Sequence, residues 1–169
     1  MMNEVLDIGC GINARDEATV VLDLRDDYAD VYKGKKEVIV HDCNNLPLPF
    51  ANATFDKVHC HSMVEHIDVS LEAFCAEVHR ILKPNGFFEM SCPNALFLWF
   101  RLQYLFGWLP QNMIYNAHKK QYSYKYVEFV LYNVGFKMRP LYNLRRFLPF
   151  RNALHKDTIF IFKKVQNQV

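Results

Sequence analysis

The stretch Val5-Leu6-Asp7-Ile8-Gly9-Cys10-Gly11 determines the fold that we expect for this chain. Its first four residues suit a buried β-strand, because brief runs rich in branched apolar side chains favour strands over helices. The strand leads directly into Gly-x-Gly, although the 169 residues include only six glycines. The motif predicts a tight turn whose backbone can approach a ligand closely. Gly-x-Gly also occurs in plain turns, so the neighbouring segments decide between these two interpretations.

Strands and helices alternate after this turn. Apolar residues at helical spacing predict a helix over 69–82, with Asp68 or Ser70 as its cap, and Ser123 and Gly135 suit the two ends of another helix. Such alternation predicts an α/β fold with a mostly parallel sheet, closed by an antiparallel pair of strands. Short apolar runs that end in turn residues predict further strands at residues 19–22, 37–41, 55–60, 87–92, 136–144 and 157–162.

Acidic residues stand at the ends of two predicted strands, Asp23 after the second and Asp42 after the third. In such sheets the carboxyl edge binds ligands, and an acid at the end of the second strand commonly accepts ribose hydroxyls. The loose dinucleotide pattern Gly9-x-Gly11-x-x-Ala14 is present, but Asp23 follows Gly9 by 14 residues and not by about 20. The connection over residues 11–19 is also too short for a normal crossover helix, so a nicotinamide-dependent oxidoreductase is the less favoured alternative.

A set of short motifs resembles class I S-adenosylmethionine-dependent methyltransferases of the small type 11 kind. The motifs keep the family's order over residues 4–92, and residues 118–136 resemble its later helix, which ends in Gly-Phe. The resemblance implies a Rossmann-like, mostly parallel sheet with an antiparallel last strand. The motifs are Leu6-Asp7-Ile8-Gly9-Cys10-Gly11, Val21-Leu22-Asp23-Leu24, Asp42 with Leu46-Pro47-Leu48-Pro49-Phe50, Phe55-Asp56-Lys57-Val58, Glu65-His66 and Ile81-Leu82-Lys83-Pro84-Asn85-Gly86.

The resemblance also implies S-adenosyl-L-methionine as the cofactor. Asp23 would bind its ribose and Leu24 would lie beside the adenine, while Asp42 would accept a hydrogen bond from the adenine amino group. The backbone amide of Cys43 would lie nearby, and the residues of the first turn and of the fourth strand's end would surround the methionine part. The cofactor residues implied in this way are Asp7, Gly9, Cys10, Gly11, Asp23, Leu24, Asp42, Cys43, Ser62 and Met63.

The sequence departs from the family in ways that shorten the first helices. Asn13 replaces the third glycine of the usual loop, the first helix is nearly absent, and the stretch over residues 25–36 is short. These losses leave sheet surface that must be covered, either by a second copy of the chain in a homodimer or by the aromatic segment after residue 93. They also motivate an alternative in which the fold is a non-catalytic subunit or scaffold.

Histidines are the candidate acid–base groups. His66 follows the strand that ends near the transferable methyl group, and we assign it either a structural or orienting role or that of a base or substrate ligand. His118 and Tyr122 precede the later helix and are candidate substrate-binding residues. His59 and His61 share one face of a strand and could suggest zinc, but no second cluster of ligands accompanies them, so we predict no metal site.

Charge and aromatic content divide the chain at residue 93. Residues 1–92 carry 16 acidic and 8 basic side chains, whereas residues 93–169 carry 2 acidic and 12 basic ones. The second part also holds 18 of the 25 aromatic residues, many of them in an apolar insertion over 95–110. That insertion could be a buried cover for the sheet, a lid over a greasy substrate or an interfacial membrane helix, but it is too short to be a transmembrane segment.

We therefore expect a single methyltransferase domain over residues 1–169, with a cofactor-binding half at 1–92 and a substrate-facing half at 93–169. The basic, aromatic half favours a small or lipid-like, anionic acceptor, with peripheral membrane contact as one setting. Phosphate contacts and stacking on RNA are the alternative, because bases and aromatics are interleaved. Five cysteines without a CxxC pair and an N-terminus without an apolar signal segment predict a cytoplasmic protein.

Overall fold

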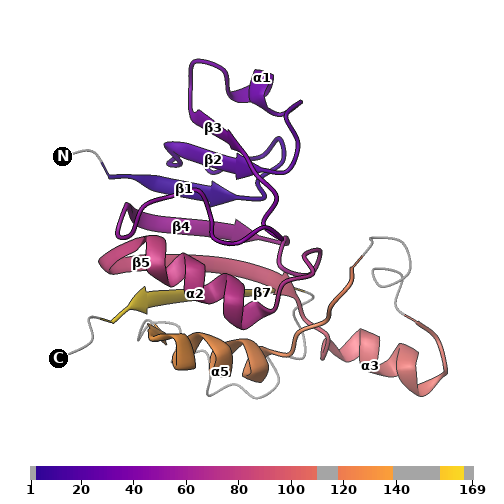
Figure 1. The fold of residues 1–169 in the computed structure, drawn as a ribbon. Coiled ribbons are helices and arrows are strands. Elements are labelled where there is room, and N and C mark those ends of the chain that lie inside the picture. Colours follow the sequence, from indigo (N-terminus) through magenta and orange to yellow (C-terminus); the bar gives the residue numbers. More distant parts are fainter. Residues whose placement is uncertain (1–2, 110–117, 139–156, 166–169) are drawn as a thin grey trace.

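The computed structural model describes residues 3–109, 118–138 and 157–165, which form a seven-stranded sheet with helices packed against it (Figure 1). The strand order is β3-β2-β1-β4-β5-β7-β6. The first five strands pair in parallel, while β7 pairs antiparallel with both β5 and β6. The strands are β1 (Val5–Ile8), β2 (Val20–Asp23), β3 (Glu37–Val40), β4 (Phe55–His61), β5 (Leu82–Pro93), β6 (Phe136–Met138) and β7 (Asp157–Lys164).

This architecture confirms the predicted fold class, a mostly parallel Rossmann-like sheet with an antiparallel last strand. Each predicted strand is present, with ends shifted by a few residues. The largest shift is in β5, which follows helix α2 (Leu71–Ile81) without a loop. The turn residues Pro84-Asn85-Gly86 lie inside the assigned strand, where Asn85 adopts a left-handed φ of 66°. Residues 139–144 of the predicted sixth strand lie outside the described residues.

Helices α2 and α5 (Tyr124–Val134) lie side by side across one face of the sheet, and the main core lies between them and the strands (Figure 1). Both helices begin at a serine whose Oγ accepts a backbone N–H, Ser70 from Ala73 and Ser123 from Tyr126. Gly135 ends α5 in the left-handed conformation, as its position predicts. The core residues of this face include Leu6, Ile8, Leu22, Val58, Cys60, Phe74, Val78, Phe88, Met90, Val127, Leu131, Phe160 and Phe162.

The opposite face of the sheet has much less helical cover. Residues 9–19, which join β1 to β2, contain no helix, and α1 (Ala29–Tyr32) has only four residues. Within the described ranges, α1 is the only helix that contributes to the second, smaller cluster on this face, where Tyr32 packs with Val5 and Val21. The prediction of shortened first helices is therefore confirmed. In β4 and β5 this face carries Lys57, His59, His61, Glu89 and Ser91, because alternate strand residues point to opposite sides.

Helix α3 (Leu98–Leu105) projects away from the sheet (Figure 1). Only Phe100 of this helix is buried, whereas Trp99 is 56% exposed and Leu105 is 77% exposed. Among the described residues of the apolar insertion, 95–109, the helix therefore does not form the buried cover that was one expectation from sequence. The described residues include no helix long and apolar enough to cross a membrane.

Candidate functional site

The carboxyl ends of the four parallel strands β1 to β4 meet at one edge of the sheet. The sheet order places β1 between β2 and β4, so the chain reverses its direction of winding at the β1–β4 boundary. Open α/β sheets bind ligands in the crevice at such a point. The structure thus gathers the predicted cofactor residues at the edge where that architecture places a ligand.

The turn after β1 is held by hydrogen bonds to its neighbours. The Gly11 N–H donates to Asp23 Oδ2 at 2.9 Å, and the Arg15 N–H donates to Asp7 Oδ2 at 2.8 Å. The Tyr32 hydroxyl donates to the Gly11 carbonyl and accepts from the Ala14 N–H, both at 2.8 Å. These bonds hold the turn in place, and residues 9–19 contain no helix.

Gly9 and Met63 form a close contact between the first and fourth strand ends. Gly9 has a φ of 68°, and a Cβ added to it would lie 2.8 Å from Met63 Cβ. Real Cβ atoms do not approach that closely, so the turn can pass the β4 loop only at a glycine. Ser62 precedes Met63 in a left-handed conformation, with a φ of 49°, and its side chain is exposed.

The remaining predicted cofactor residues lie along the same edge. Leu24 is 64% exposed directly after Asp23, and the Asp42 carboxylate accepts from the Asn44 N–H at 2.8 Å. Cys43 is buried in the core, and burial raises the pKa of its thiol to about 12. Burial and the charge of Asp7 raise the pKa of Cys10 to about 11, so both cysteines remain thiols at neutral pH.

These residues fit S-adenosylmethionine. No atom of the described residues lies within 4 Å of the place where a Gly11 side chain would stand, which leaves room beside the backbone of the turn. Asp23 accepts from Gly11 and Arg25, and a carboxylate has about four acceptor positions, so capacity remains for ribose hydroxyls. Leu24 offers an apolar surface next to it, of the kind that an adenine ring covers.

The histidines predicted to act on the acceptor side lie together. The rings of His66 and His118 meet edge to face, with centroids 4.8 Å apart. His118 Nε2 lies 3.9 Å from Oε1 of Glu65, which is buried. The backbone N–H groups of Lys119 and Lys120 donate to the Glu65 carbonyl and hold the segment before α5 against the loop after β4.

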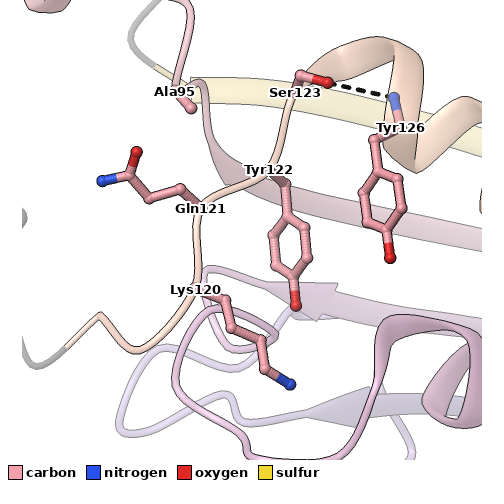
Figure 2. Close-up of a pocket in the computed structure, with 6 residues that line it drawn as sticks. All are labelled: Ala95, Lys120, Gln121, Tyr122, Ser123 and Tyr126. Carbon is pink, nitrogen blue, oxygen red and sulfur yellow. Dashed lines mark hydrogen bonds between the residues drawn. The ribbon is translucent and has the colours of Figure 1, made fainter.

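Tyr122, four residues after His118, lines a pocket of about 610 Å³ (Figure 2). The Tyr122 side chain is buried, its hydroxyl lies 3.4 Å from the Val64 carbonyl, and its ring stacks on that of Tyr126. Burial raises the pKa of Tyr122, which keeps the hydroxyl protonated. The lining residues are Ala95, Lys120, Gln121, Tyr122, Ser123 and Tyr126.

Sequence reasoning missed Tyr32 as a support of the first turn and Glu65 as a buried carboxylate beside His118. Tyr32 lies 21 residues after Gly11, and no local pattern joins these two positions. Glu65 had a signal, because it stands next to His66 in a motif shared with the family. Its burial, however, depends on the segment before α5, which is distant in sequence.

Comparison with known proteins agrees with this geometry. Residues 6–90 match the methyltransferase domain family, and the chain is 34% identical over 101 residues to a probable methyltransferase, PMT28, of Arabidopsis thaliana. That match covers 53% of this chain and 14% of the plant protein. An uncharacterised protein of Methanocaldococcus jannaschii is 31% identical over 120 residues, which cover 69% of this chain and 44% of that protein. The chain thus spans less than half the length of either relative.

Among solved structures, an S-adenosylmethionine-dependent methyltransferase from Archaeoglobus fulgidus has the same fold, with a TM-score of 0.69 and 20% identity. The match covers 96% of this chain and 86% of that one. S-adenosylmethionine is thus the cofactor associated with this family and fold, as the sequence predicts. The family match over residues 6–90 spans half of the sequence and contains the turn, Asp23, Asp42 and the β4 loop, and this chain therefore belongs to the methyltransferase domain family.

Proposed function

We propose that this domain binds S-adenosylmethionine and transfers its methyl group to a small or lipid-like, anionic acceptor. The observation that carries the proposal is the joining of three strand ends at the edge of the sheet. Gly11 bonds to Asp23, and Gly9 passes Met63 too closely for any side chain. The two contacts leave a glycine turn between an ordered carboxylate and the loop that carries the histidines.

In this proposal the predicted residues of the cofactor-binding half each contact a different part of S-adenosylmethionine. Asp23 accepts the ribose hydroxyls, Leu24 covers one side of the adenine, and Asp42 with the Cys43 backbone amide binds the adenine edge. The residues of the first turn (Asp7, Gly9, Cys10 and Gly11), together with Ser62 and Met63, surround the methionine part. Bound there, S-adenosylmethionine supplies a methyl group on a positively charged sulfur, which is already a strong electrophile.

The acceptor side is proposed to lie in the pocket before α5. Tyr122 forms part of its wall and reaches the Val64 carbonyl, one residue beyond Met63, so the pocket begins where the methionine end is proposed to lie. His118 lies two residues before Lys120 of the pocket wall and packs against His66, and we assign these two histidines the role of orienting the acceptor or removing its proton. Positioning alone supplies much of the rate of such a transfer, so the proposal does not require a base.

Charge and surface apolarity support an anionic, greasy acceptor. Lys120 lines the pocket, and residues 93–169 carry 12 basic and 2 acidic side chains. The exposed apolar side chains of α3 and its C-terminal flank lie in the same half of the chain and would contact an acyl chain or a lipid surface. These side chains are Leu98, Trp99, Leu102, Tyr104, Leu105, Phe106, Trp108 and Leu109.

Calorimetry on the full chain with S-adenosylmethionine and with its demethylated product tests the first half of the proposal. Binding of either ligand is expected, and no binding at millimolar ligand would overturn it. The second half is tested by measuring the demethylated product formed with anionic lipid vesicles, short fatty acids and RNA as acceptors. Turnover with RNA alone would contradict the acceptor class, and tight cofactor binding without turnover on any acceptor would favour the non-catalytic scaffold.

A further inference from the structure

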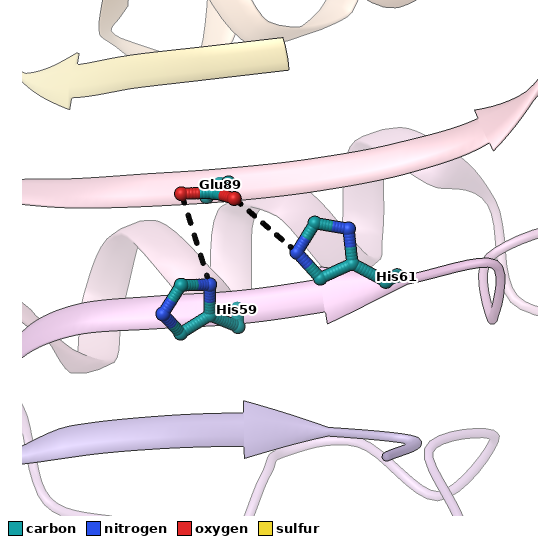
Figure 3. Close-up of side chains that lie close together, drawn as sticks. All are labelled: His59, His61 and Glu89. Carbon is teal, nitrogen blue, oxygen red and sulfur yellow. Dashed lines mark ion pairs between the residues drawn. The ribbon is translucent and has the colours of Figure 1, made fainter. Parts of the chain in front are cut away.

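The sheet face opposite α2 and α5 carries a cluster that the methyl-transfer proposal does not use. His59 and His61 of β4 lie beside Glu89 of β5, and Figure 3 shows the carboxylate facing both rings. His59 Nδ1 is 3.9 Å from Glu89 Oε2, and His61 Nε2 is 3.5 Å from Glu89 Oε1. One nitrogen of each ring and one carboxylate oxygen all lie within 4.8 Å of one another. Three atoms able to bind a metal therefore converge from two neighbouring strands.

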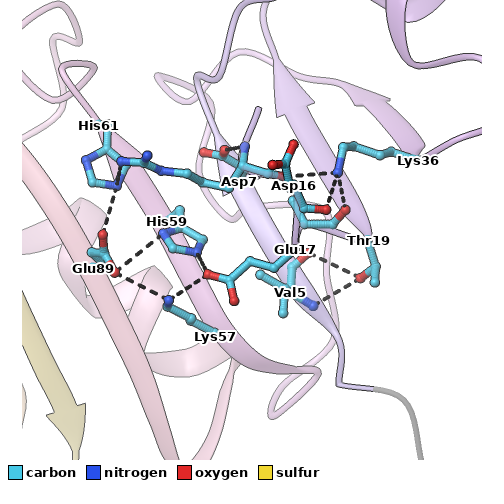
Figure 4. A network of polar contacts seen from close by, with 12 residues as sticks. Val5, Asp7, Asp16, Glu17, Thr19, Lys36, Lys57, His59, His61 and Glu89 are labelled. Carbon is cyan, nitrogen blue, oxygen red and sulfur yellow. Dashed lines mark hydrogen bonds and ion pairs between the residues drawn. The ribbon is translucent and has the colours of Figure 1, made fainter. Parts of the chain in front are cut away.

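The other polar contacts of each ring determine which nitrogen carries the proton. His59 Nε2 lies 2.8 Å from the Glu17 carboxylate, which only accepts, so Nε2 is the protonated atom (Figure 4). His61 Nε2 lies 3.1 Å from Arg15 Nη2, which only donates, so the proton is on Nδ1, which donates to Ser91 Oγ at 3.0 Å. The unprotonated Nδ1 of His59 therefore faces Glu89, and the unprotonated Nε2 of His61 lies near both Glu89 and Arg15.

Among the described residues, the His59 nitrogen that faces Glu89 has no hydrogen-bond partner. His59 is 1% exposed, and its Nδ1 atom is buried without a donor or acceptor in that part of the chain. A buried lone pair that faces a carboxylate is unfavourable unless a positive charge lies between them.

We propose that His59, His61 and Glu89 form a transition-metal site, for which Zn²⁺ is the best match. Two imidazoles and one carboxylate are a common set of zinc ligands, with water completing the shell. Glu17 and Ser91 are then the outer partners that fix each ring, an arrangement typical of histidines bound to metals. Ligand atoms at bond lengths of about 2.0–2.1 Å around a tetrahedral ion lie roughly 3.3 Å apart, so binding requires only a small closure of the cluster.

Two basic side chains occupy this space in the structure. Lys57 Nζ lies 3.3 Å from Glu89 Oε2 and 2.7 Å from Glu17 Oε1, and Arg15 contacts His61. Arg15 is exposed and Lys57 is only partly buried, so both can turn toward water when a metal enters. They supply positive charge to the cluster in the absence of metal and compete with it in its presence.

The sequence did not predict this site because its third ligand is remote. His59 and His61 are two residues apart, but Glu89 is 28 residues after His61 and joins them only through the pairing of β4 with β5. Cys60, between the two histidines, points into the main core and takes no part. A bound metal would tie the β1–β2 connection, through Glu17, to the centre of the sheet on the face where the first helices are short.

The test is a titration of chelator-treated full chain with zinc chloride, followed by calorimetry and by the visible spectrum with Co²⁺. Wild type is expected to bind one ion at this site. His61→Asn and Glu89→Gln should each weaken binding at least tenfold, while His41→Asn, a histidine on the β3 side, should leave it unchanged. His61 is partly exposed, so its variant is expected to fold even where a change at buried His59 does not.

Removal of the competing positive charge should strengthen zinc binding instead of weakening it. Lys57→Met should tighten zinc binding about tenfold, because it removes a cation a few ångströms from the site. Absence of binding at 100 µM zinc, or equal affinity in wild type and His61→Asn, would overturn the proposal. Loss of binding in His118→Asn but not in His61→Asn would also overturn it, because the ion would then belong to the Glu65–His66–His118 group.

Discussion

The backbone N–H of Gly11 donates a 2.9 Å hydrogen bond to Oδ2 of Asp23 and so joins the end of β1 to the end of β2. That bond helps to hold the connection between β1 and β2, because residues 9–19 contain no helix. Tyr32 supports the same turn from α1, through its bonds to Gly11 and Ala14. The side chains of Asp23 and Tyr32 therefore hold the turn at this edge of the sheet.

Asp23→Ala should weaken S-adenosylmethionine binding by at least tenfold. The substitution removes the proposed acceptor of the ribose hydroxyls and also frees the Gly11 N–H, and a hydrogen bond to a charged group contributes about 1.5–3 kcal/mol. Calorimetric Kd values for wild type and variant measure the effect. Asp27→Ala is the matched control, because that exposed carboxylate pairs with Arg25 nearby. Equal weakening in both variants would show that general charge, and not the Gly11–Asp23 contact, governs binding.

Gly9→Ala and Gly11→Ala should have different consequences. Both glycines have positive φ, which costs an L-residue roughly 1–2 kcal/mol. A side chain at Gly9 would also collide with Met63, whereas the space at Gly11 is open. In urea unfolding, we therefore expect Gly9→Ala to lose clearly more stability than Gly11→Ala. Gly11→Ala should instead lose cofactor affinity while keeping most of its stability, and a reversed order would contradict the described turn.

Much of the fold was predictable because its signals are local. The strand at Val5–Ile8, the capping of α2 by Ser70, and the helix from Ser123 to Gly135 all follow from short runs of neighbouring residues. The strand-end positions of Asp23 and Asp42 were predictable for the same reason. Once those strands are placed in parallel, their ends must meet at one edge.

The remaining features depend on contacts between distant segments. Tyr32 reaches Gly11 only because α1 packs on the open face, and Glu89 reaches His59 only through strand pairing. The apolar insertion was ambiguous, since an apolar helix can be buried in the core or exposed for an unseen ligand. The structure shows α3 to be exposed, with Phe100 as its one buried residue.

Arg80 should be a main support of the loop between β3 and β4. Its guanidinium donates to the carbonyls of Leu48 and Phe50 and to Glu77, which in turn accepts the Leu48 N–H. Arg80→Ala is expected to lower the free energy of unfolding by about 2–3 kcal/mol in urea titrations, since several partners lose a charged donor. Arg80→Lys should restore only part of the lost stability, because an ammonium cannot reproduce the several hydrogen bonds of a planar guanidinium. A loss under 0.5 kcal/mol, the range expected for the exposed Arg25→Ala, would contradict this role.

The exposed aromatic residues of α3 and its C-terminal flank should affect binding of the acceptor and not of the cofactor. Trp99→Ser with Phe106→Ser should reduce binding to anionic lipid vesicles severalfold in sedimentation assays, because both side chains are more than half exposed. The affinity for S-adenosylmethionine should stay at the wild-type value. Phe129→Ser is the control, since that residue is 62% exposed but belongs to α5. An equal loss in the control would show that the effect is one of general surface hydrophobicity.

His79 should make the fold sensitive to acid. Burial and the charge of Lys164 lower its pKa, and its Nε2 atom is buried against Gly135, with the ring edge-on to Phe136. Because the unfolded chain takes up the proton more readily, this contribution is complete above the ordinary histidine pKa and is lost as the pH falls through the lowered folded-state value. The free energy of unfolding then changes with pH, on account of His79, by at most about 1.4 kcal/mol per pH unit.

His79→Gln should flatten the fall in urea stability between pH 7.5 and pH 5 relative to wild type. Lys164→Met should flatten this fall in stability in part, because loss of the neighbouring ammonium raises the pKa of His79 again. That variant also loses the bonds from Lys164 Nζ to the His79 and Leu82 carbonyls, so its stability should drop at every pH while its slope decreases. If His79→Gln kept the full wild-type slope, the acid sensitivity would have to arise from other histidines, and the packing of this ring against Gly135 and Phe136 would not be its cause.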